Sequence, residues 1–228
     1  MLKPFDISES LRSRLEKIET RVTDAYSDGT HQREERISGH LTGLLATELD
    51  GTFASGSNTV RLDVGAYEAR DEPESGVDIG LRYQLVTDDF HHSTGLLIQS
   101  KRVGNHDVHL PSQCYKMLVR TQEAYIFAYS QDEIGVFPAI PIYRDGGTGG
   151  KFTKYYQLGF VTFLSQFFEG FHGDLRIADT IDQPAEAVPV PERVKYLVDI
   201  KASVNRLEAD FNEVERDHFT RIQPDGRL

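Results

Sequence analysis

The chain has 228 residues, of which 39% are hydrophobic and 27% charged, a balance typical of a folded globular protein and not of a disordered or fibrous one. Its 36 acidic residues outnumber 25 Lys and Arg residues, and the net charge of −11 disfavours a surface that attracts nucleic acid as a whole. The sequence has no apolar run of the ~18 residues that a membrane span needs, no apolar N-terminal signal and one cysteine, so we expect a cytoplasmic protein without membrane association or internal disulfides.

Two helices are predicted in the first part of the chain. Apolar residues recur every three or four positions over residues 8–28, with charged residues between them, which predicts an amphipathic helix. The DGTH stretch interrupts this pattern, and a second apolar stripe predicts a helix over residues 32–49. We treat residues 1–31 as an N-terminal helical segment of a single domain that spans residues 1–228.

Extended segments follow the second helix. Runs of β-branched and aromatic residues between turn-rich stretches predict three strands, and a proline near its start marks a helix. The strands are expected at residues 59–68, 77–86 and 94–103, the helix at 111–123, and two further strands at 124–129 and 134–143. This order predicts an α/β fold.

Residues 144–228 are expected to form a helical extension. A glycine-rich loop covers residues 144–154, a helix is expected over 160–171, and three prolines mark a linker at 182–191. Apolar residues over 197–214 are spaced three and four apart, the pattern of helices that pack side by side. We expect this last helix to pack on the N-terminal helix or to join a second subunit, as a homodimer or with a partner protein.

Polar side chains gather on two of the predicted strands. Because side chains alternate along a strand, Asp78 lies on the polar face of the second strand, and Gln99 and Lys101 share one face of the third. If these two strands pair as a hairpin, the carboxylate, the amide and the ammonium group converge. Acids of the first strand, Asp63 and Glu68, could also reach this point.

A carboxylate on the second helix is a fourth candidate. The 100° turn per residue places Glu34 near the apolar stripe of that helix, whereas Glu35 points away from it. A carboxylate on a core-facing stripe needs a partner, which a hard divalent cation with oxygen ligands would supply. Glu35 and the acids of the N-terminal helix remain rivals for this position.

These residues carry a resemblance to a known family. Glu34 on a helix, Asp78 in GVDIG and Gln99-Ser100-Lys101 in LLIQSKRV, followed by a helix and the strand AYIFAYS, resemble the PD-(D/E)xK nucleases of the restriction-endonuclease-like fold. The resemblance covers residues 32–143. Within the family, the sequence is similar to the Mrr-like branch, in which Gln replaces the acid two residues before the lysine. The resemblance implies a mixed central sheet flanked by helices, and Mg²⁺- or Mn²⁺-dependent hydrolysis of DNA in bacterial defence.

The resemblance also implies a role for each residue. Asp78 would bind Mg²⁺ directly, Gln99 would be the variant ligand, and the Ser100 carbonyl would be a further oxygen ligand. Glu34 would complete the metal shell, directly or through water. Lys101 would orient the attacking water and stabilise the charge that develops on the phosphate.

DNA would have to meet this acidic protein at a local basic surface. Cationic side chains outnumber acidic ones over residues 91–130, and the glycine-rich loop adds more. The candidate DNA contacts are Arg102, Gln113, Lys116, Arg120 and Lys151. Two alternatives stay open: a non-catalytic module that binds another protein through its acidic helices, and an RNA-directed nuclease with the same site.

Overall fold

The computed structural model describes residues 9–30, 33–55, 58–69, 77–87, 90–148, 152–180, 194–204 and 219–222. The helices are α1 (Glu9–Ser27), α2 (Glu34–Leu49), α3 (Leu110–Leu118), α4 (Ala139–Arg144), α5 (Phe160–Phe168) and α6 (Leu175–Thr180), with a 3-10 turn at Phe152–Lys154. The strands are β1 (Gly51–Ser55), β2 (Asn58–Ala69), β3 (Ile79–Val86), β4 (His91–Arg102), β5 (Ala124–Tyr129), β6 (Ile134–Pro138), β7 (Leu158–Gly159), β8 (Tyr196–Val204) and β9 (Phe219–Arg221). Among these described helices, none combines the length and the apolar character needed to cross a membrane.

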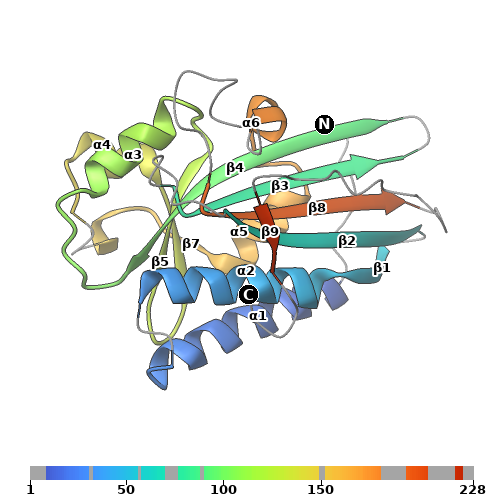
Figure 1. Cartoon of the computed structure of the whole chain (residues 1–228), viewed down its shortest axis with the longest axis horizontal. Helices are drawn as coiled ribbons and strands as arrows, with labels where there is room; N and C mark the ends of the chain where they lie inside the picture. Colours follow the sequence, from blue (N-terminus) through green and yellow to red (C-terminus); the bar gives the residue numbers. More distant parts are fainter. Residues whose placement is uncertain are drawn as a thin grey trace.

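The described strands form one mixed sheet. Its strand order is β1-β2-β8-β3-β4-β5-β6-β7 (Figure 1). The remaining strand, β9, is not part of this linear order and pairs with β2. β3 and β4 are an antiparallel pair, whereas β5 runs parallel to β4 and β8 runs parallel to β3. The predicted α/β class, with a mixed central sheet flanked by helices, is confirmed.

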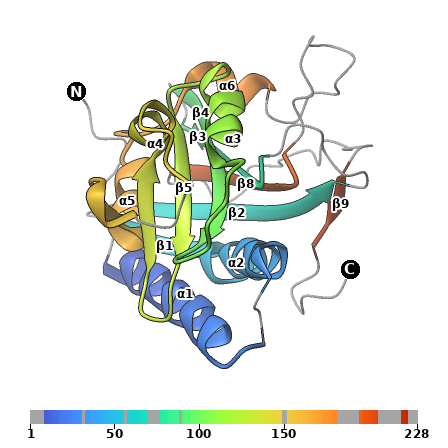
Figure 2. The ribbon, with the colours of Figure 1, turned by 90° about the vertical axis from the view of Figure 1, so that its left-hand side faces the viewer.

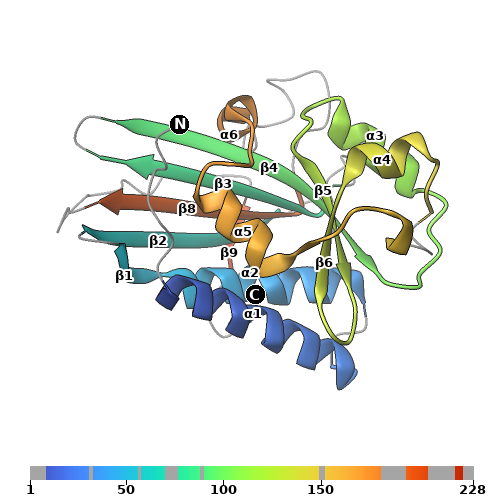
Figure 3. The same cartoon turned by 180° about the vertical axis from the view of Figure 1, so that it is seen from behind.

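Apolar side chains form a core on each face of the sheet. Helices α1, α2 and α5 share one core with alternate strand residues such as Ile98 and Phe127. Helices α3, α4 and α6 share the other with the intervening residues, such as Leu97 and Ile126. Figure 2 shows α1 and α2 together on one side of the sheet and α3 and α4 together on the other, and Figure 3 shows α5 on the side of α1.

Most of the elements expected before residue 172 are confirmed. The helices over residues 8–28 and 32–49 correspond to α1 and α2, and the three expected strands correspond to β2, β3 and β4. The expected helix over 111–123 is α3, which ends at Leu118, and the helix over 160–171 is α5. The short strand β1, which pairs with β2 as a hairpin, was not expected.

The strand expected over residues 134–143 is only half correct. It ends at Pro138, where the chain turns into the short helix α4. Pro141 lies in the first turn of this helix, where a missing N–H costs no hydrogen bond. The change of direction matters because it packs α4 against α3.

The helix expected over residues 197–214 is wrong for the part that the structure describes. Residues 196–204 form β8, a strand between β2 and β3, and residues 205–214 lie outside the described part of the chain. A central strand is buried on both faces, so its apolar residues do not alternate with polar ones and can imitate a helical spacing. The expected contact between terminal helices is therefore not made by these residues, and α1 packs on α2 and α5. The linker expected at 182–191 also lies outside the described residues.

Candidate functional site

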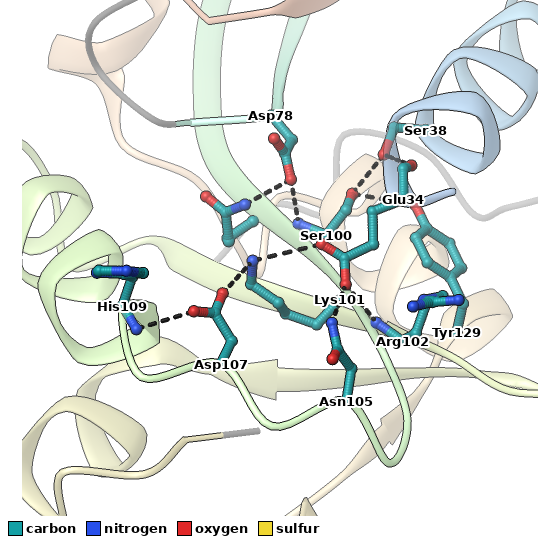
Figure 4. Close-up of polar contacts among 11 residues, drawn as sticks. Glu34, Ser38, Asp78, Ser100, Lys101, Arg102, Asn105, Asp107, His109 and Tyr129 are labelled. Carbon is teal, nitrogen blue, oxygen red and sulfur yellow. Dashed lines mark hydrogen bonds and ion pairs between the residues drawn. The ribbon is translucent and has the colours of Figure 1, made fainter. Parts of the chain in front are cut away.

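The predicted convergence of Asp78 and Gln99 is confirmed by the pairing of β3 with β4. Ile79 lies opposite Ile98 in this antiparallel pair, so Asp78, which immediately precedes β3, reaches the next residues of β4. Its Oδ2 atom accepts hydrogen bonds from Gln99 Nε2 at 2.5 Å and from the Ser100 N–H at 2.8 Å (Figure 4). Two adjacent residues of one strand therefore hold this carboxylate in a fixed orientation.

The surroundings of Asp78 disfavour the charged form of its carboxyl group. Burial raises the pKa of Asp78 to about 6, although the hydrogen bond from the Ser100 N–H and the nearby Lys101 charge act in the opposite direction. The neighbouring Glu34 carboxylate raises the pKa further. A carboxylate in such surroundings is stabilised by any additional cation that binds beside it.

Lys101 lies at the centre of the charged groups. Its side chain is 4% exposed, and its Nζ atom lies 2.8 Å from Asp107 Oδ2 and 3.5 Å from Glu34 Oε2. Figure 4 shows the lysine pointing between these two carboxylates. A buried ammonium group requires such partners, and here they fix its position next to Asp78.

Glu34 is the first residue of α2, and its carboxylate points into the site. Its Oε1 atom accepts hydrogen bonds from Asn105 Nδ2 at 3.0 Å and from the Arg102 N–H at 3.3 Å. Glu35, its rival, is 65% exposed and pairs with Lys195 at 3.1 Å. Of the two adjacent carboxylates, only Glu34 contacts the residues around Lys101.

A turn after β4 supplies the Asn105 contact. The Asn105 N–H donates to the Arg102 carbonyl at 3.1 Å, and Gly104 has a φ of +84° inside this turn. A positive φ at the third position of a turn favours glycine, because a side chain there is strained. Gly104 therefore allows the chain to reverse and to return Asn105 to Glu34.

Buried hydroxyl groups join α2 to the sheet behind the site. Ser38 Oγ lies 2.7 Å from Ser100 Oγ, which lies 3.2 Å from the Tyr129 hydroxyl of β5. All three side chains are fully buried, and burial raises the pKa of Tyr129, so the phenol stays protonated. Ser38 is one helical turn after Glu34, and this contact fixes the start of α2 relative to Lys101.

Asp107, Asn105, Ser38 and Tyr129 were missed in the sequence analysis. Asp107 had a readable signal, because Asp often precedes a helix, where its side chain accepts a backbone N–H. Here Asp107 Oδ1 accepts the His109 N–H at 2.8 Å, just before α3. Nothing in the sequence pattern indicated that its other oxygen would contact Lys101.

The remaining candidates are spread over a wider area. Lys116 is exposed on α3, while Arg102, Gln113 and Arg120 are partly buried. Lys151 lies outside the described residues. The structure does not bring Asp63 and Glu68 to the site: they lie on β2, opposite Lys201 and Tyr196 of β8, which separates β2 from β3.

The oxygen donors at the site suit a hard divalent cation. The Oε1 atom of Gln99 is buried and accepts no hydrogen bond within the described residues, and it belongs to the same amide that donates to Asp78. Across the residues that the structure describes, no three or more His, Cys, Asp or Glu side chains lie close enough together to form a metal cluster. Mg²⁺, however, commonly binds one or two carboxylates and completes its shell with water and phosphate oxygens, so Asp78, Glu34 and Gln99 fit it.

Comparisons of the chain with protein-family models, with curated proteins and with solved structures find no match. The site geometry is therefore the ground on which a function can be assigned. It combines a partly buried carboxylate, an amide oxygen without a hydrogen-bond donor in the described residues, and a buried lysine between two further carboxylates. Such a set can bind a cation and a phosphate group side by side.

Proposed function

We propose that this protein is a metal-dependent endonuclease that hydrolyses DNA phosphodiester bonds on a restriction-endonuclease-like core, acting in bacterial defence as its resemblance implies. The observation that supports this function best is the meeting of Asp78, Gln99 and Lys101 at paired strands, with Glu34 reaching in from α2. These residues come in the order and on the elements expected of a PD-(D/E)xK nuclease with a Gln variant.

The metal would be held by oxygen atoms alone. Asp78 and the Oε1 atom of Gln99, which accepts no hydrogen bond in the described residues, would supply the first ligands, and the Ser100 carbonyl and Glu34 would add oxygens directly or through water. When bound, a divalent cation lowers the pKa of a coordinated water and neutralises phosphate oxygens. Because Gln99 carries no charge where an acid is usual, the site has one negative charge fewer, and we expect weak metal affinity.

Lys101 supplies the fixed positive charge of the proposed site. Negative charge increases on the phosphate oxygens as water attacks, and a positioned ammonium group stabilises that charge most when it is already desolvated and oriented. The Lys101 side chain is buried and held by Asp107 and Glu34. The folded protein therefore already holds the ammonium group in position before substrate binds.

The proposed core runs from α2 through β2, β3 and β4 to α3 and β5. β4 and β5 are parallel and joined by α3, and β3 and β4 are antiparallel, which agrees with the expected order. The departure is β8, which lies between β2 and β3. It enlarges the sheet on the side away from α3 and leaves the β3–β4 pair that carries the site intact.

The direct test is cleavage of supercoiled plasmid DNA in the presence of Mg²⁺ or Mn²⁺, with EDTA as the negative control. The wild type should nick or linearise the plasmid, and Asp78→Ala and Lys101→Ala should each abolish cutting. Asp132→Ala, which changes an exposed acid on the β5–β6 turn, should cut like the wild type. If all variants behave alike, whether they cut or not, the assigned site is wrong.

A parallel digestion of RNA separates the two nuclease hypotheses. If RNA is cut and DNA is not, the site is retained but the substrate changes. If neither is cut with either metal, the remaining hypothesis is a non-catalytic module on this fold that binds another protein.

A further inference from the structure

Two exposed tyrosines lie side by side on the surface formed by α3 and α4. Tyr115 is 52% exposed and Tyr143 42% exposed, and their ring centroids are 5.7 Å apart with an interplanar angle of 32°. α3 packs against α4, and Figure 2 shows these helices next to each other at the same end of the sheet. The aromatic pair therefore belongs to one continuous surface, which we call the α3–α4 surface.

The α3–α4 surface has the opposite charge to the molecule as a whole. α3 contributes Lys116 and α4 contributes Arg144, and neither helix contains an acidic residue. Asp145, directly after α4, is paired with Lys154 at 3.3 Å. In a chain of net charge −11, a surface with cationic and aromatic side chains but no acid on its helices is suited to a polyanion.

The α3–α4 surface begins at the candidate site. The N–H of His109, the residue before α3, donates to Asp107, whose other oxygen contacts Lys101. Tyr115 follows five residues after the first residue of α3, which is about 8 Å along a helix that rises ~1.5 Å per residue. A strand that has its phosphate at Lys101 can therefore reach Tyr115 within a few nucleotides.

We propose that unpaired bases of the substrate stack on Tyr115 and Tyr143 while Lys116 and Arg144 contact the flanking phosphates. This rests on the proposed nuclease function and names its substrate class: DNA with a single-stranded or locally opened segment beside the scissile bond. Stacking on aromatic side chains needs an exposed π-face, which bases inside a duplex do not offer. Stacking is independent of base sequence, which agrees with a protein in which 36 acidic residues outnumber 25 Lys and Arg residues.

Binding without cleavage tests the proposal. A short fluorescent single-stranded oligonucleotide and the same sequence as a duplex are titrated with the protein in EDTA, and anisotropy gives both affinities. The wild type should bind the single strand at least tenfold more tightly. Tyr115→Ala and Tyr143→Ala should each weaken single-strand binding about tenfold, the magnitude typical of one lost base stack, and change duplex binding less than twofold.

Matched variants separate stacking from general effects. Tyr115→Phe keeps the ring and should bind like the wild type, and Phe90→Ala, which removes a ring that is 53% exposed at the end of the β3–β4 pair away from Asp78, should also have no effect. Equal single-strand affinity of Tyr115→Ala, Tyr143→Ala and the wild type would overturn the proposal. A concentration-dependent dimer that disappears in the two alanine variants, measured by light scattering, would also overturn it and assign the surface to a second copy of the chain.

The two proposals can fail separately. Because EDTA removes the metal, tyrosine-dependent binding of the single strand without any cutting in Mg²⁺ or Mn²⁺ would support the stacking surface and refute the nuclease. Plasmid cutting that needs Asp78 and Lys101, together with binding that ignores both tyrosines, would refute the stacking surface and support the nuclease.

Discussion

The Asp107 carboxylate lies 2.8 Å from the Lys101 ammonium group and is the nearer of the two carboxylates that hold it. Burial alone would raise the pKa of Asp107, but hydrogen bonds from Lys101 and from the His109 N–H outweigh it and lower the pKa. Asp107 is therefore charged at neutral pH, and it ties the start of α3 to the lysine of β4.

Removing this charge should misplace the lysine. If the proposed nuclease function is correct, Asp107→Asn should lower kcat for DNA cleavage about tenfold to hundredfold, a loss typical for a residue that orients a catalytic group, with KM for DNA changed less than threefold. Steady-state kinetics at saturating metal measure both values. Asp132→Asn, in an exposed turn, is the matched control and should keep wild-type kinetics. A kcat for Asp107→Asn equal to that of the wild type would mean that Glu34 alone orients Lys101.

The raised pKa of Asp78 makes the stability of the metal-free protein depend on pH. Its folded pKa of about 6 lies above the ordinary value of 3.8, so the folded state holds a proton that the unfolded state releases. The stability from this group is fully present below pH ~4 and is lost as the pH rises through 6. The shift corresponds to at most about 3 kcal/mol.

Asp78→Asn, which cannot ionise, tests this expectation. In EDTA the variant should be more stable than the wild type at pH 8, by up to about 3 kcal/mol, and the difference should shrink towards zero below pH 4. Urea unfolding at several pH values measures it. Asp132→Asn, which changes an exposed acid in the β5–β6 turn, should show no such trend. A pH-independent difference between Asp78→Asn and the wild type would contradict the assigned cause.

The part of the site that rests on local geometry could be predicted from the sequence. Alternation along β3 and β4 is set by the strand itself, and a hairpin brings neighbouring strands together, so the meeting of Asp78 with Gln99 followed from the pattern. Helical periodicity likewise favoured Glu34, but it left Glu35 as a rival until the contacts of Glu34 with Lys101 and of Glu35 with Lys195 distinguished them. The contact between Lys101 and Asp107 depends on the path of a loop, which periodicity does not describe.

The position of β8 could not be predicted for a different reason. Its partners are distant in the sequence, since Asp199 pairs with Arg82, and a strand buried on both faces has no polar face to reveal its period. Its apolar residues were therefore interpreted as the seam of a helix. The same lack of a local signal hid β1, a strand of five residues.

The pair Arg82–Asp199 offers a test of this sheet order. The Arg82 guanidinium donates to both carboxylate oxygens of Asp199, at 2.8 and 3.0 Å, and both side chains are buried between β3 and β8. Asp199→Ala would leave a buried charge without this partner and should lower the free energy of unfolding by about 3–5 kcal/mol. The double variant Arg82→Met, Asp199→Leu should recover most of that loss.

An exposed ion pair provides the comparison for this experiment. Arg176 is 80% exposed and lies 2.8 Å from Asp174, so Arg176→Ala should lower the free energy of unfolding far less than Asp199→Ala does. Urea denaturation gives the free energy of unfolding of the wild type, of the two single variants and of the double variant. A cost below about 1 kcal/mol for Asp199→Ala would be incompatible with a buried pair at the centre of the sheet.

Glu34 and Glu35 are adjacent carboxylates that should differ sharply in activity. Glu34→Gln keeps an oxygen for the hydrogen bonds from Asn105 and Arg102 but removes a charge that holds Lys101 and would support the metal, so we expect kcat to fall about a hundredfold. Glu35→Gln removes a pair between a 65% exposed carboxylate and Lys195, away from Lys101, and should keep kcat within twofold.

Metal titration of the same two variants shows how Glu34 acts. If Glu34 belongs to the metal shell, higher Mn²⁺ should restore part of the activity of Glu34→Gln, because excess metal compensates for a weakened site. If Glu34 only orients Lys101, the loss should persist at every metal concentration. Equal activity of Glu34→Gln and Glu35→Gln would contradict both roles, because the two side chains would then be equivalent despite pointing to different partners.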